Sequence, residues 1–218
     1  NTVLKARQLG FSTFIQIYML DACLFRDNIS CGTIADSLDH AEEIFKDRCK
    51  FPYDNLNESI RNIQPAMQDS VRGLTFKSGS SIRVGTSLRS GTYQIVHVSE
   101  YGKICAAYPD RAREVRTGTF NAVGLGQKIF VESTAEGQEG DFYEMCQAAK
   151  IVTEGEQTLT PLDFKFHFYP WHKHPEYSLS GVTITDSKAG RSIKKPSLDV
   201  SRPIEQKYLS RMEGLTQA

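Results

Sequence analysis

The chain has 218 residues, of which 39% are hydrophobic and 10% aromatic, so it can bury one sizeable core and is not generally disordered. Its 26 basic residues balance 26 acidic residues, which excludes the strong positive field that would by itself indicate a nucleic-acid-binding protein. No stretch approaches the roughly 18 uninterrupted apolar residues that span a membrane, so we expect no membrane partner.

Apolar periodicity divides the chain into alternating strands and helices. Short apolar runs predict strands at residues 3–6, 29–35, 94–98, 128–132 and 164–169, and a β-hairpin across a glycine turn at residues 74–84. Helical spacing predicts helices at residues 12–25, from a cap at Asp36 or Ser37 to about residue 50, and at 110–123 and 140–152. Residues 52–68 show no regular pattern. This alternation indicates an α/β fold with a mostly parallel sheet flanked by helices on both faces.

The first turn of the chain has the layout of a phosphate-binding loop. A strand, a glycine turn and a helix with a hydroxyl in its first turn bring free backbone N–H groups and the helix dipole toward one anion. Residues 5–13 (KARQLGFST) depart from the pattern G-x-x-x-x-G-K-[ST], because Lys5 stands at the first glycine and Phe11 at the lysine. Lys5, helped by Arg7, can supply the cation that the phosphates require. The alternative is a surface turn with ordinary basic residues.

A second candidate lies where the strand at residues 94–98 ends in Ser99 and Glu100. A carboxylate at this position can orient and deprotonate the water that attacks a γ-phosphate. Ser99 stands where an aspartate usually holds the magnesium shell, so Ser12 and Ser99, together with water, are the candidate magnesium contacts. The alternative is a strand-end carboxylate that only faces solvent.

A third candidate is the pair of hydroxyls, Ser133 and Thr134, that ends the strand at residues 128–132. Such a pair is suited to sensing the γ-phosphate, although an ordinary turn has the same composition. The order of loop, carboxylate strand and hydroxyl-ended strand is the order that a P-loop motor with an additional strand requires.

Four segments together resemble the large terminase subunits of tailed bacteriophages. Residues 5–13 look like the altered Walker A loop of that family, and residues 97–105 (HVSEYGKIC) like the Walker B region of one of its branches. Residues 131–137 (VESTAEG) are similar to its coupling motif, and residues 164–171 (FKFHFYPW) to the strand that ends its ATPase domain. The resemblance implies an additional-strand P-loop NTPase, truncated at its N-terminal edge, which uses ATP and Mg²⁺.

The same resemblance implies roles for individual residues. Glu100 would activate water, and Arg89 would act on the nucleotide of a neighbouring subunit. The residues that would contact the nucleotide are Lys5, Arg7, Gln8, Gly10, Ser12, Thr13, Ser133 and Thr134. The implied domains are a terminase-like ATPase domain at residues 1–180, incomplete at its N-terminus, and a linker at 181–218, with a possible helix at 203–212, leading to a nuclease domain that this chain lacks.

The function implied is the packaging of viral DNA in the cytoplasm of a bacterial host. Its partners would be double-stranded DNA, the terminase small subunit, the portal protein and further copies of the chain in a ring on the capsid. Two alternatives stay open. One is a helicase-like ATPase, although these normally keep a lysine after the loop glycine and an Asp-Glu pair, and this chain has Phe11 and Ser99 there. The other is a catalytically silent module that binds nucleotide or takes part in assembly.

Overall fold

The computed structural model describes residues 1–88, 91–155, 158–174, 184–186 and 191–193. It divides into two units, Asn1–Phe168 and Tyr169–Ala218. The described part of the second unit holds a short 3-10 turn, Trp171–Lys173, and an antiparallel pair of strands, β9 (Ile184–Asp186) and β10 (Arg191–Ile193). Arg89 and the possible helix at 203–212 lie outside the described residues, and the predicted boundary near residue 180 stays a prediction.

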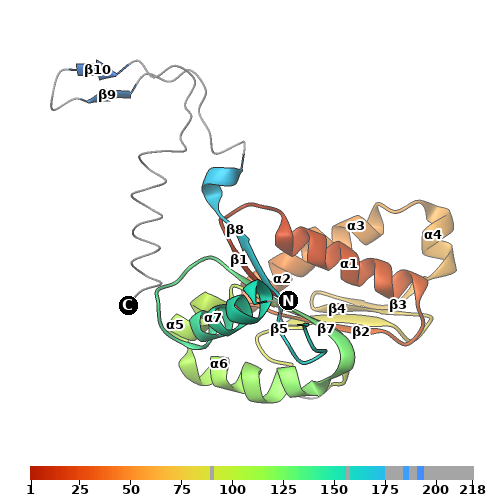
Figure 1. Cartoon of the computed structure of the whole chain (residues 1–218). Helices are drawn as coiled ribbons and strands as arrows, with labels where there is room; N and C mark the ends of the chain where they lie inside the picture. The colour runs from red at the N-terminus through yellow and green to blue at the C-terminus, as the bar shows by residue number, and fades with distance from the viewer. Residues whose placement is uncertain (89–90, 156–157, 175–183, 187–190, 194–218) are drawn as a thin grey trace. The chain divides into compact units, whose positions relative to one another are not determined.

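The first unit is built on an eight-stranded sheet (Figure 1) with the order β3-β4-β5-β2-β6-β7-β1-β8. Its strands β5, β2, β6, β7 and β1 are parallel neighbours, whereas β3 and β4 join one edge in antiparallel fashion. The strand bounds are β1 Thr2–Lys5, β2 Ser30–Ile34, β3 Ala66–Ser70, β4 Gly73–Phe76, β5 Ser81–Gly85, β6 Tyr93–Ser99, β7 Val123–Ser133 and β8 Phe166–Tyr169.

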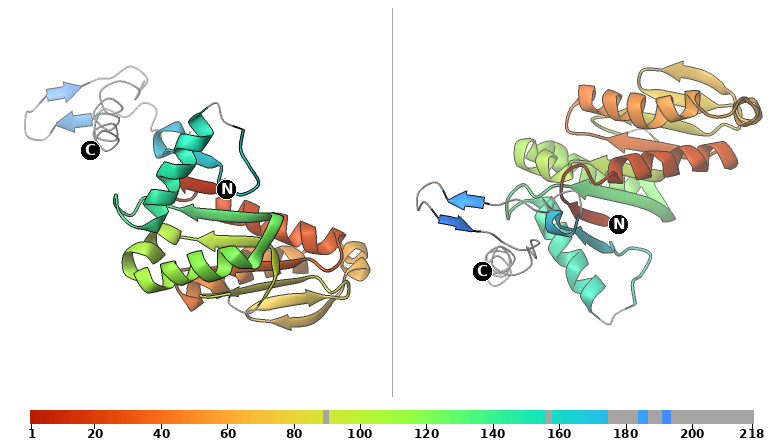
Figure 2. Two further views of the ribbon diagram at one scale, coloured as in Figure 1. Left: turned by 60° about the horizontal axis from the view of Figure 1, so that its bottom comes forward. Right: turned by 90° about the horizontal axis from the view of Figure 1, so that it is seen from above.

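Helices cover both faces of this sheet (Figures 1 and 2), and each face has its own hydrophobic cluster. One cluster joins α1, α2 and α3 to the sheet, and the other joins α5, α6 and α7. The helix bounds are α1 Phe11–Phe25, α2 Leu38–Phe45, α3 Phe51–Asp54, α4 Glu58–Ile63, α5 Tyr101–Ala107, α6 Pro109–Glu114 and α7 Asp141–Glu154, with π-helical turns at Lys46–Lys50 and Val115–Thr119 and a 3-10 turn at Phe120–Ala122.

Strand alternation decides which side chains of β6 and β7 face α1. Ile95 belongs to the α1 cluster, whereas Val96 and Val98 belong to the opposite one. Because successive side chains of a strand point to opposite faces, His97 and Ser99 share the face of Ile95. On β7, Phe130 packs against the α1 cluster and Val131 belongs to the opposite one, so Glu132 lies on the α1 face and Ser133 on the face of α5 and α7.

The predicted fold class is confirmed. The sheet is mostly parallel and flanked by helices, and β7 lies between β1 and β6, where the additional strand belongs. The hairpin at residues 74–84 is confirmed as β4 and β5. Residues 52–68, where the sequence shows no regular pattern, hold most of α3, all of α4 and the start of β3, and α5 was missed. The helix predicted at residues 110–123 is α6 followed by π-helical and 3-10 turns.

None of the helices in the described ranges is long and apolar enough to cross a membrane.

Candidate functional site

A cavity of about 530 Å³ opens at the edge of the sheet where the parallel strands β1 and β6 end. Ligands of parallel α/β sheets bind at this edge, outside the carboxyl ends of the strands. The lining residues are Lys5, Arg7, Gln8, Leu9, Gly10, Phe11, Ser12 and Thr13 from the segment between β1 and α1, His40 and Arg48 from the segment after β2, Ser99, Glu100 and Lys103 around the end of β6, and Glu136.

The turn between β1 and α1 has the backbone of an anion-binding loop. Gln8 and Gly10 both have positive φ angles, 57° and 75°, and Gly10 occupies the N-cap position of α1. The first hydrogen bond of the helix runs from the backbone N–H of Phe14 to the carbonyl of Gly10 at 2.9 Å. The backbone N–H groups of the first helical turn therefore have no partner within the helix and lie at its positive end, beside the cavity.

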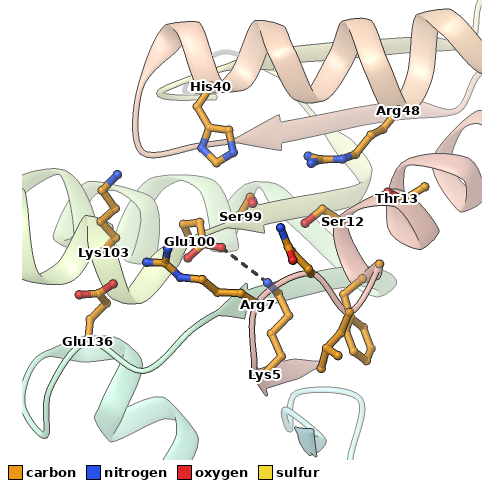
Figure 3. A pocket seen from close by; sticks show the side chains of 14 residues that line it. Lys5, Arg7, Ser12, Thr13, His40, Arg48, Ser99, Glu100, Lys103 and Glu136 are labelled. Carbon is orange, nitrogen blue, oxygen red and sulfur yellow. Dashed lines mark ion pairs between the residues drawn. The ribbon is translucent and has the colours of Figure 1, made fainter. Parts of the chain in front are cut away.

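Lys5 reaches from the end of β1 toward two carboxylates. Its Nζ lies 2.8 Å from Oε2 of Glu132 and 3.5 Å from Oε1 of Glu100, and Figure 3 shows Lys5 and Glu100 pointing toward one another. Lys5 is 8% exposed and lines the cavity. The lysine at the front of the loop is thus held by two anions in a position that a phosphate group can also reach.

Glu132 is the carboxylate on which the loop and two strands converge. It is fully buried, and its Oε1 accepts hydrogen bonds from Ser12 Oγ at 2.6 Å and from Ser99 Oγ at 2.9 Å. His97 Nε2 lies 3.2 Å from the same oxygen. Burial acts to raise the pKa of Glu132, but His97 and Lys5 favour the ionised form and hold the pKa well below its usual range. Glu132 is therefore a buried anion with a partner on each of its two oxygens.

A chain of buried amide and imidazole groups fixes His97. The side-chain amide Nε2 of Gln16, on α1, lies 2.9 Å from Nδ1 of His97 and 2.9 Å from Oγ1 of Thr33 on β2. Because an amide nitrogen only donates, Nδ1 of His97 accepts, and its Nε2 carries the hydrogen that faces Glu132. A neutral His97 satisfies this arrangement, as expected for a histidine packed in the core.

Glu100 has a left-handed backbone conformation, with φ of 53° and ψ of 44°, at the junction between β6 and α5. Non-glycine residues adopt this region only where the surrounding structure imposes it, and such residues cluster at functional sites. The Oε2 of Glu100 accepts a hydrogen bond of 3.3 Å from Thr134 Oγ1. The backbone turn and the contacts with Lys5 and Thr134 hold this carboxylate at the cavity.

The structure brings most of the predicted site residues together at this cavity. Thr134 does not line it but contacts Glu100, which does. Ser133 is fully buried on the other face of the sheet, close to Gly102: a Cβ atom added to this glycine would lie 2.9 Å from the Oγ of Ser133. This arrangement gives no support to direct nucleotide contact by Ser133. The proposed role of Arg89 is untested, because this residue is not described.

Residues to which the sequence analysis gave no role also line the cavity. Arg48 lies on the π-helical turn after α2 and points into the cavity (Figure 3), and within the described part of the chain it has neither an ion pair nor a hydrogen bond. His40 and Lys103 also line it, and both pair with Asp36. No local motif marked Arg48, and Glu132 was quoted within a motif but given no role, because its burial against Ser12 is visible only in the fold.

No known family model matches the sequence, and no curated protein is similar to it in sequence. Solved structures are similar in fold. The large terminase of bacteriophage HK97 matches with a TM-score of 0.57 and 14% identity over 98% of this chain and 44% of its own. The large terminase ATPase domain of Thermus phage P74-26 gives a TM-score of 0.46 at 15% identity, over 78% of this chain and 74% of its own. A large terminase from a thermophilic bacteriophage, in complex with ATP-gamma-S, gives 0.43 at 10% identity, over 76% and 38%.

This chain spans less than half of the length of the HK97 protein, but nearly all residues of this chain take part in the match. A likeness at this level of identity establishes the architecture. The chain therefore shares its fold with the matched part of the HK97 large terminase.

Proposed function

We propose that the chain is the ATP-hydrolysing part of a tailed-bacteriophage large terminase. The observation that carries the proposal is the convergence of Lys5, Ser12 and Glu100 at one cavity, beside the positive end of α1, in a chain with the terminase fold. Each of these groups corresponds to a task in phosphoryl transfer: neutralising phosphate, contacting the metal and activating water.

Nucleotide phosphates would bind where the loop offers positive charge. The backbone N–H groups of Ser12 and Thr13, at the positive end of α1, favour an anion, and Lys5, Arg7 and Arg48 add cationic side chains around the same cavity. Lys5 already contacts two carboxylates, so a bound phosphate would join an existing cluster of charges rather than create one. The backbone N–H groups and the cationic side chains together support binding of a polyanion such as ATP rather than of a neutral ligand.

The donor set also fits magnesium bound together with a nucleotide. Among the described residues there is no group of three or more His, Cys, Asp or Glu side chains that could hold a metal ion by itself. Mg²⁺ at nucleotide sites takes few protein ligands and completes its shell with phosphate oxygens and water. The hydroxyls of Ser12 and Ser99 would face it, and the ion would supply further neutralisation of phosphate charge.

Glu100 is placed to act as the general base. Its carboxylate lines the cavity and is oriented by Thr134 on one oxygen and by Lys5 on the other. A positioned base contributes roughly 10²- to 10⁴-fold to the rate. We propose that Glu100 orients and deprotonates the attacking water, and that Thr134 couples the state of this carboxylate to the end of β7.

The biological role follows from the fold as a proposal. Hydrolysis would drive double-stranded DNA into a capsid, in the cytoplasm of a bacterial host, with a terminase small subunit, a portal protein and a ring of identical subunits as partners. In such a ring, Arg89 would serve the site of a neighbour.

The test combines an ATP-binding titration with an ATPase assay on the parent chain and on two variants. Glu100→Gln should bind ATP with nearly the parent affinity and lose turnover by 100-fold or more, in line with the roughly 10²- to 10⁴-fold worth of a base. Glu139→Gln, which changes an exposed carboxylate outside the cavity, is the control and should turn over normally. A parent chain that binds ATP without turning it over would instead be a silent nucleotide-binding module, and Glu100→Gln at the parent rate would exclude Glu100 as the base.

A further inference from the structure

The carboxylate of Glu132 lies on β7, one strand away from β6, the strand that corresponds to the Walker B strand of P-loop enzymes. In P-loop enzymes the loop hydroxyl and an aspartate of the Walker B strand together hold the magnesium ion. Here the corresponding strand, β6, ends in Ser99, which has no charge. The loop hydroxyl, Ser12 Oγ, instead donates a hydrogen bond of 2.6 Å to Glu132, on the next strand of the sheet.

We infer that Glu132 replaces the missing aspartate: it positions Ser12 for the magnesium ion of the bound nucleotide. The inference rests on the proposed ATPase function and extends it to a residue of β7. Glu132 would act through Ser12, and so as a positioning residue and not as a catalytic one.

Strand order explains how a residue of β7 can do this. β7 lies between β6 and β1, and the register sets Glu132 beside Ser99 on one side and beside Val3 on the other. A carboxylate at this point of β7 is therefore one strand closer to the loop than a carboxylate at Ser99 would be. The longer side chain of glutamate reaches Ser12, while Ser99 Oγ donates to the same oxygen at 2.9 Å.

The surroundings of Glu132 fix its orientation. Oε1 faces Ser12, Ser99 and His97, and Oε2 faces the ammonium group of Lys5. His97 is itself held by Gln16 of α1. Groups that hold a metal-contacting side chain in this way typically account for 10- to 100-fold in metal affinity.

A purely structural role, as a counter-ion for Lys5, makes a different prediction. Loss of a counter-ion would change the binding of ATP to the same extent with and without magnesium. Loss of the group that positions Ser12 would reduce only the additional affinity that magnesium gives.

The experiment measures ATP affinity with Mg²⁺ and with EDTA, in a Glu100→Gln background that prevents turnover. In the parent, Mg²⁺ should strengthen binding, and Glu132→Gln should reduce this gain by roughly 10- to 100-fold while affinity in EDTA changes by less than about threefold. Glu139→Gln, an exposed carboxylate outside the cavity, serves as the control and should keep the full gain. A second variant, Glu132→Gln with Ser99→Asp, returns a carboxylate to β6, keeps the number of buried charges, and should restore most of the gain.

The outcomes separate this inference from the function on which it rests. A parent that binds no ATP would overturn both. A parent that binds ATP while Glu132→Gln keeps the full magnesium gain, or loses affinity equally in EDTA, would overturn only the role of Glu132. If Glu132→Gln does not fold, the paired variant decides: a restored gain supports the inference, and a folded protein without the gain overturns it.

Discussion

Replacing Lys5 with methionine tests the charge cluster directly, without any nucleotide. Methionine keeps most of the side-chain volume but removes the ammonium group that lies 2.8 Å from Glu132, which is fully buried. Removing one partner of a buried ion pair typically costs about 3–5 kcal/mol, because the other charge stays buried without compensation. We therefore expect the free energy of unfolding to fall by an amount in this range.

The assay is urea denaturation followed by far-UV circular dichroism, with the slope against urea concentration expected to stay constant. Lys128→Met is the matched control: this lysine is exposed on β7, and its replacement should change stability by no more than about 0.5 kcal/mol. Lys5→Met combined with Glu132→Gln should regain part of the loss, since no fully buried charge is then left unpaired. If Lys5→Met costs no more than Lys128→Met, the two groups do not form a buried ion pair in solution.

Three further predictions concern the same cavity. The folded chain holds the pKa of Glu132 below its ordinary value of 4.5, so ionisation of Glu132 stabilises the fold above that pH and this contribution is lost as the pH falls below it. Denaturation between about pH 7 and about pH 3.5 should therefore show the parent losing more stability than Glu132→Gln, by about 1 kcal/mol per pH unit below 4.5. Parallel pH profiles of the two proteins would contradict this. Arg48→Ala should weaken ATP binding by about tenfold, the worth of one charge-assisted hydrogen bond, whereas Lys46→Ala, an exposed lysine of the same π-helical turn, should leave it unchanged; equal effects would remove Arg48 from the site. Phe11→Ala should reduce ATP affinity much less than Lys5→Ala, because a phenyl ring cannot neutralise phosphate, and equal tolerance of both changes in the titration would argue against Lys5 as the phosphate-binding lysine.

Local patterns were sufficient to predict the parts of the site that lie on one continuous segment. The strand, turn and helix around Gly10 are consecutive in sequence, and the apolar run before Glu100 marks a buried strand by itself. Helix α5 was missed because it begins directly after Glu100, with no side-chain cap to mark its start.

The role of Glu132 could not be read in the same way. Ser12 and Glu132 are 120 residues apart, and their contact exists only because β7 is inserted between β6 and β1. Strand order is a property of the whole sheet. The sequence pattern of residues 129–133 would be the same at any place in the sheet, so it does not show which strands lie beside β7. Arg48 was missed for a related reason, since its direction depends on the π-helical turn that carries it.

The left-handed backbone of Gln8 and Glu100 has a consequence for how this protein responds to engineering. For a non-glycine residue this conformation costs on the order of 1 kcal/mol or more, and glycine adopts it without that cost. Libraries selected for heat resistance alone would therefore favour glycine at these two positions, and at position 100 they would discard the proposed base. Engineering this chain for thermal stability therefore requires a functional screen in parallel with the thermal screen.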